Sequence, residues 1–136
     1  STSFADGTGA AASFDRPIAI ALDRATGDLY VGDETHLRLR KITPGGVVTT
    51  IAGSGVRGDV DGTGAAASFC NLCGIAVHQD GTILVTDCTC SKLRVVTPAG
   101  VVTTLAGGAA GHADGVGTAA GLQFPVGVAV DNEGTI

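Results

Sequence analysis

Apolar residues alternate with polar or small residues along several short runs of this chain. In its central part four such runs follow one another, at residues 74–78, 82–87, 92–97 and 101–106. Alternation with a period of two is typical of half-buried β-strands. The breaks between the runs contain Gly, Pro, Asp and Ser, which favour tight turns. The pattern predicts four strands joined by three short turns, which is an antiparallel meander.

The same pattern is repeated along the chain. Residues 6–14 (DGTGAAASF) recur at 61–69, and a looser copy follows at 114–122. Residues 43–53 (TPGGVVTTIAG) recur at 97–107 as TPAGVVTTLAG, 54 residues later. Two independent markers therefore indicate one structural unit of this length, repeated in tandem.

The unit is too long for the coil of a parallel β-helix, and a β-sandwich does not require near-identical sequence at this spacing. Radial packing of blades, as in a β-propeller, covers the two apolar faces that a lone meander leaves open. We therefore predict an all-β chain of propeller blades, two complete and a third represented by its first strand. The expected blades are 17–53, 72–107 and the partial 125–136, separated by Gly/Ala-rich linkers at 1–16, 54–71 and 108–124.

The linkers carry large apolar residues at equivalent repeat positions. After each Gly/Ala-rich stretch, which we expect to form a turn and one short helical turn, stands Phe14, Phe69 or Leu122. Each is expected to act as a core wedge between consecutive blades.

A succession of short motifs resembles the NHL-repeat family over nearly the whole chain. The motifs lie at 17–23 and 125–131 (a first strand ending in Asp), 27–33, 36–44 and 47–53. The resemblance implies a propeller, usually of six blades. Members of that family mostly bind proteins, nucleic acids or glycans, and occasional relatives are lyases or hydrolases. The second copy departs from the pattern at Leu72, at His78 and over 88–94.

All four cysteines lie in the second copy, at Cys70, Cys73, Cys88 and Cys90. The first pair precedes the first strand and the second pair follows the second strand, so antiparallel pairing brings them to one rim. Two disulfides between the pairs are favoured, and a four-thiolate zinc site and free thiols are the alternatives. Disulfides imply an oxidising compartment, so we expect an extracellular or cell-surface protein.

Charge limits the classes of partner. The formal net charge is −5 and the calculated pI is about 4.8, so the chain has no basic stripe for a phosphate backbone and we expect no nucleic-acid partner. No apolar run is long enough to span a bilayer, so no membrane insertion is expected. The basic residues of the third strands are expected to form one solvated face for a glycan or acidic partner. These residues are Arg38, Arg40, Lys41, Lys92 and Arg94.

Catalytic constellations are not evident in the sequence. The three histidines occupy different repeat positions, the Asp-Gly turns lack the full ligand set of a calcium loop, and there is no nucleophile elbow or phosphate loop. We therefore expect no cofactor and a non-enzymatic structural or interaction module, which packs against further blades or copies of itself, in fibre-like arrays or closed rings. A soluble binding propeller for a protein, peptide or glycan is the alternative, and a propeller lyase or hydrolase is a more distant one.

Overall fold

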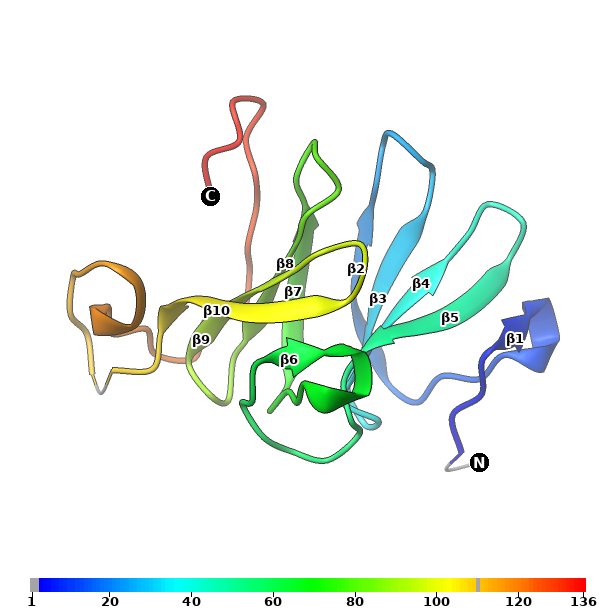
Figure 1. Cartoon of the computed structure of the whole chain (residues 1–136), viewed down its shortest axis with the longest axis horizontal. Coiled ribbons are helices and arrows are strands. Elements are labelled where there is room, and N and C mark those ends of the chain that lie inside the picture. Colours follow the sequence, from blue (N-terminus) through cyan, green and yellow to red (C-terminus); the bar gives the residue numbers. More distant parts are fainter. Residues whose placement is uncertain (1–2, 110) are drawn as a thin grey trace.

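The computed structural model, which describes residues 3–109 and 111–136, contains two twisted antiparallel sheets that stand side by side like neighbouring blades (Figure 1). The strand order is β1-β5-β4-β3-β2 in the first sheet and β6-β10-β9-β8-β7 in the second. No helix among these residues is long and apolar enough to cross a membrane.

The four long strands of each sheet lie at the predicted runs, although the second strand of blade 2 is buried along its whole length. In blade 1 they are β2 Pro17–Leu22, β3 Leu29–Asp33, β4 Arg38–Ile42 and β5 Val47–Ala52. In blade 2 they are β7 Leu72–Val77, β8 Ile83–Asp87, β9 Lys92–Val96 and β10 Val101–Gly107. The last turn of each meander needs a left-handed residue, which Gly46 (φ 79°) and Gly100 (φ 87°) supply. Local turn chemistry and alternation therefore fix the meanders.

Each sheet has a fifth strand that the sequence analysis did not predict. The short strands β1 (Gly7–Thr8) and β6 (Gly62–Thr63) pair with β5 and β10. Each continues into a 3₁₀ turn, η1 (Gly9–Ala11) or η2 (Gly64–Ala66), as expected for the linkers. A Cβ atom on Gly7 or Gly62 would lie about 3.0 Å from the turn that follows, so glycine permits this fold-back. The linker thus covers the outer edge of the blade that follows it, and a covered edge cannot pair with other chains.

The main core lies between the two sheets. Leu39 and Tyr30 of blade 1 pack against blade 2, where Phe69, Leu72 and Val85 are fully buried. The innermost strands β2 and β7 run next to each other. Burial of each large apolar side chain contributes about 1.5–3 kcal/mol, so this interface joins the blades into one body.

The third repeat follows blade 2 as an extended segment. Thr86 Oγ1 donates a hydrogen bond to the carbonyl of Val126 (2.9 Å), and Asp131 closes a turn by accepting from the amides of Glu133 and Thr135 (2.8 Å each). The stretch 111–136 contains the 3₁₀ turn η3 (Gly117–Ala119) but no strand. The expected first strand of a third blade is therefore an extended segment that pairs with no strand of the described residues.

Candidate functional site

A buried arginine holds each linker against its blade. Arg40 is fully buried, and its guanidinium donates to the carbonyls of Ala5 (2.7 Å) and Ser13 (3.1 Å) and to the carboxylate of Asp6 (2.8 Å). Asp33, at the end of β3, lies 3.5 Å away on the other side. One side chain thus joins both ends of the linker to the sheet, and we call this arrangement the arginine clamp.

Blade 2 repeats the clamp group by group. Arg94, also fully buried, donates to the carbonyls of Val60 and Ser68 (3.1 Å each) and to the carboxylates of Asp61 (2.8 Å) and Asp87 (3.2 Å). The guanidinium groups also lie over aromatic rings, Arg40 over Phe14 at 4.9 Å and Arg94 over Phe69 at 5.4 Å. These cation–π contacts add to the electrostatic stabilisation.

The clamps correct the expectation of a single solvated basic face. Arg40 and Arg94 are wrongly placed in that face, because the linker folds over both side chains and buries them. Their charge is compensated by carboxylates and carbonyls, which burial requires. In the sequence, the clamp is visible as a repeated acid–base pair: Asp6 with Arg40 in the first copy, and Asp61 with Arg94 in the second.

The clamp carboxylates also bind the outer strand. Asp6 accepts from the amide and hydroxyl of Thr50 (3.0 Å each), and Asp61 accepts from the same groups of Thr104 (3.1 and 2.9 Å). Partial burial acts to raise the pKa of both carboxyls, but the hydrogen bonds from the threonines and the arginines outweigh it and hold each pKa below its usual range. The charged form of these residues therefore stabilises the fold.

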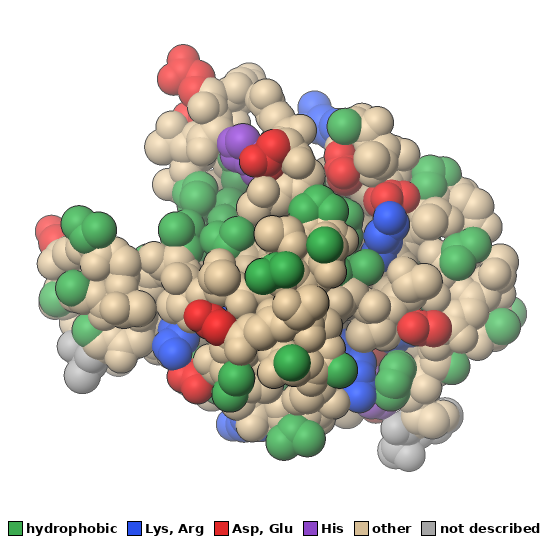
Figure 2. Space-filling model, viewed as in Figure 1, with side chains coloured by type: hydrophobic (Ala, Val, Ile, Leu, Met, Phe, Trp, Pro, Cys, Tyr) green, Lys and Arg blue, Asp and Glu red, His purple; other side chains and the backbone are tan. Residues whose placement is uncertain are grey.

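The other basic residues lie in three different places. Arg38 donates to the carbonyls of His36 and Ser54 and lies over the ring of Phe4 at 3.8 Å. Lys92 pairs with Asp59 of the linker. Lys41 points to the groove between the blades and pairs with Asp28 at 2.8 Å. Lys and Arg side chains are correspondingly scattered over the face shown in Figure 2.

The cysteines form two disulfides between the two predicted pairs. Cys70 is joined to Cys90 and Cys73 to Cys88, with Cα–Cα distances of 5.7 and 5.8 Å that are usual for disulfides. They connect the end of the linker and strand β7 to the loop between β8 and β9. Asp87 lies beside Cys70 and Cys90, but its carboxylate accepts from the amides of Cys70 and Asn71, so its oxygens already have partners. With the thiols joined, the residues do not fit the zinc alternative.

The three predicted wedges have different surroundings. Phe69 is fully buried between the blades, as expected. Phe14 is half-buried and lies on the opposite face of blade 1, over which the structure places no blade. Leu122 lies against blade 2 near Leu93 and Pro125.

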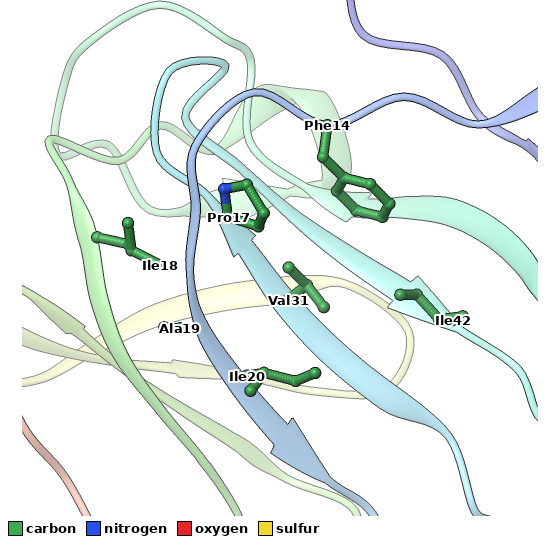
Figure 3. A pocket seen from close by; sticks show the side chains of 7 residues that line it. All are labelled: Phe14, Pro17, Ile18, Ala19, Ile20, Val31 and Ile42. Carbon is green, nitrogen blue, oxygen red and sulfur yellow. The ribbon is translucent and has the colours of Figure 1, made fainter. Parts of the chain in front are cut away.

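The face around Phe14 is an open apolar hollow of about 310 Å³, which we call the open face. In Figure 3, Phe14, Pro17, Ile20, Val31 and Ile42 gather on one side of the sheet. Ile20 is 63% exposed, which is unusual for a large apolar residue beside a core. This exposed apolar face is therefore a candidate interaction surface.

The histidines do not converge. His36 lies 3.1 Å from Asp33 in a loop of blade 1, whereas His78 pairs with Asp80 in the turn after β7 and His112 lies beyond β10. The described residues therefore offer no histidine cluster for catalysis.

Comparison with known proteins gives the fold but no family. No family model matches the chain, and no curated protein is similar to it in sequence. Among solved structures, the chain resembles a protein of unknown function from Bacteroides thetaiotaomicron with a TM-score of 0.72 and 26% identity, over 84% of this chain and 30% of that one.

Two further solved structures share the fold at lower identity. An auxiliary nutrient binding protein from Bacteroides thetaiotaomicron matches with a TM-score of 0.69 and 18% identity, over 84% of this chain and 32% of that one. Virginiamycin B lyase from Staphylococcus aureus matches with a TM-score of 0.50 and 18% identity, over 69% of this chain and 28% of that one. The chain spans about a third of the length of these propeller-like structures. It is therefore a partial β-propeller, with two blades and the beginning of a third repeat.

Proposed function

We propose that this chain is a non-enzymatic structural and interaction segment of a secreted or cell-surface β-propeller, whose open face packs against a further blade of the same repeat. One observation carries the proposal: the equivalent face of blade 2 is already covered by a blade. There, Phe69 and Leu72 are 0% exposed and Ile75 is 8% exposed.

The residues of the open face occupy the same repeat positions. Phe14 corresponds to Phe69, Pro17 to Leu72 and Ile20 to Ile75. Pro17 and Ile20 are apolar and exposed, and both lie in strand β2, so no turn accounts for their exposure. Apolar residues that are buried in one copy and exposed in the other indicate a missing cover of the same shape.

A blade is the occupant that fits this face. Blade 1 covers blade 2 with the buried side chains of Ala19, Tyr30 and Leu39. At Gly32, a Cβ atom would lie 3.0 Å from Cβ of Leu72. A blade with the same small residues can approach the open face in the same way, and a second copy of the chain can supply one.

The two disulfides support the secreted or surface location, because they persist in oxidising compartments. A propeller lyase or hydrolase stays a weaker candidate, since the fold does not determine chemistry. A binding propeller for a small ligand is favoured by a separate polar groove between the turns of the two blades.

The test is the mass of the oxidised chain by light scattering after size exclusion, together with the fluorescence of a dye that binds exposed apolar surface. We expect multiples of 13.3 kDa for the wild type and smaller particles for Ile20→Lys. The matched variant Ile75→Lys should instead destabilise the chain, because Ile75 is already buried. A wild-type monomer that binds no dye and behaves like Ile20→Lys would overturn the proposal.

A further inference from the structure

A polar groove lies where the turns of the two blades meet. It has a volume of about 260 Å³ and is lined by Asp23, Asp28, Tyr30 and Lys41 of blade 1 and by Gln79 and Asp80 of blade 2. It is separate from the open face of blade 1, so the inference below does not depend on the proposed packing.

Tyr30 is the central group of this groove. The residue is 3% exposed, and its hydroxyl forms no hydrogen bond with any residue in 3–109 or 111–136. The charges of Lys41, Asp28 and Asp23 all act on the pKa of this hydroxyl, so they lie around it. The ring is buried, whereas the hydroxyl oxygen is not fully enclosed, so it opens onto the groove and can take a hydrogen-bond partner there.

The chain contains a second groove in the same repeat position, between blade 2 and the third repeat. Its volume is about 250 Å³. At the positions of Asp28, Tyr30 and Lys41 it carries Thr82, Leu84 and Val95, as shown by the register in which Tyr30 faces Lys41 and Leu84 faces Val95. The blade therefore folds with no charge and no phenol at these positions.

The comparison of the two grooves shows that a blade can form without the charged and phenolic side chains of the first groove. An apolar set is generally at least as stabilising as a partly buried ion pair of the same volume. The fold therefore does not require the polar set of the first groove, although the Lys41–Asp28 pair adds to its stability. A ligand that satisfies the Tyr30 hydroxyl and the Lys41–Asp28 pair explains this set.

We propose that the groove binds one ring of a neutral polyhydroxylated ligand, such as a hexose or the end of a glycan. Adjacent donors and acceptors suit vicinal hydroxyls: Lys41 and Tyr30 donate, and the carboxylates of Asp23 and Asp28 accept. Three carboxylates beside one ammonium disfavour an anionic sugar. The volume lies below the range of about 300–1,000 Å³ typical of drug-sized ligand pockets, so it suits a single ring.

The experiment uses an internal probe. Tyr30 is the single tyrosine of the chain, which has no tryptophan, so tyrosine fluorescence reports on this groove alone. The oxidised chain is titrated with glucose, galactose, mannose and N-acetylglucosamine, with glucuronate and glucosamine as charged counterparts. We expect a saturable change with at least one neutral sugar at millimolar concentration and none with glucuronate.

The variants exchange the polar groups for those of the second groove. Lys41→Val and Asp28→Thr should each weaken binding by tenfold or more while leaving the thermal midpoint nearly unchanged. The same exchange in the second groove, Val95→Lys with Thr82→Asp, should leave binding in the first groove unaffected. For Tyr30→Phe, which removes only the hydroxyl, binding is measured by calorimetry and should be lost in parallel.

Three outcomes would overturn the inference. They are the absence of a saturable change with any neutral sugar, equal binding by wild type and Lys41→Val, and binding of glucosamine alone. The last would identify a cation site. None of these outcomes bears on the mass measurement that tests the open face.

Discussion

The two blades share one scaffold and differ in how the linker is joined to the loop between the second and third strands. In blade 1 this junction contains the ion pair of Arg16 with Glu34 (3.1 Å) and the contact of His36 with Asp33 (3.1 Å). In blade 2 the equivalent junction carries two disulfides. The arginine clamp beneath the junction is the same in both, so the clamp is the constant element and the junction is the variable one.

The strongest test of this comparison removes the clamps one at a time. Arg94→Met removes the positive charge beside the buried Asp87 carboxylate, which keeps only neutral amide donors, and the donor of the Val60 and Ser68 carbonyls. Arg40→Met does the same to Asp33 and to the carbonyls of its linker. We expect each to lower the free energy of unfolding by about 3–5 kcal/mol, as measured by urea unfolding of the oxidised chain. Losses below about 1 kcal/mol would show that the clamps are not the constant element.

Removal of a disulfide tests the variable element. The double variant Cys73→Ala/Cys88→Ala should lower the free energy of unfolding by about 2–4 kcal/mol, because the bond restricts the unfolded chain. The reverse exchange, Ile18→Cys/Glu34→Cys, places the same bond at the equivalent positions of blade 1. A gain in the grafted chain that disappears on reduction would confirm that the junctions are interchangeable, whereas a loss under oxidising conditions would contradict it.

Acid should weaken both blades through the clamp carboxyls. The pKa values of Asp6 and Asp61 are lower in the folded chain than in the unfolded chain, where an aspartate titrates near about 3.9. Their contribution is therefore complete above that value and is lost as the pH falls through the folded pKa. Thermal midpoints measured between pH 6 and pH 2 should fall steeply below about pH 4, and less steeply in Asp61→Asn. An equal slope in wild type and variant would exclude Asp61 as a contributor.

The smallest effect concerns the groove that distinguishes blade 1. Burial raises the pKa of Tyr30 above 10.0, and Asp28 and Asp23 add to the rise while Lys41 opposes it. Alkaline titration followed by phenolate absorbance should give one transition above that value, because there is one tyrosine. In Lys41→Val the transition should move higher still, and Val95→Ala in blade 2 is the control. A transition at the value of free tyrosine would contradict the burial of this side chain.

Much of the fold follows from the sequence because short-range signals determine it. The alternation at 82–87 and 101–106 and the glycines at 46 and 100 identify the strands and turns of each meander. The repeat supplies the blade architecture, since two equal meanders must cover one another. The pairing of Cys70 and Cys73 with the later cysteines follows from the antiparallel neighbourhood of β7 and β8.

The features that the sequence did not predict depend on contacts between residues that are far apart in the chain. Residues 6–9 have the composition of a turn, and their strand pairing with β5 depends on the surface that the sheet offers. Arg40 stands in an alternating strand whose polar positions indicate solvent, but the linker covers that side. The polar groove needs Tyr30 and Gln79, 49 positions apart in the chain, and no local pattern places them together.

The direction of the clamps affects how the chain emerges from the ribosome. Each clamp arginine binds a linker carboxylate that precedes it by 33 or 34 residues. The short strands β1 and β6 likewise pair with strands that come later in the chain, β5 and β10. Every group needed to close the first clamp has therefore been synthesised once β5 is complete. We therefore expect the first clamp to be able to close before the second linker is made, so that blade 2 packs on a blade whose linker is already in place.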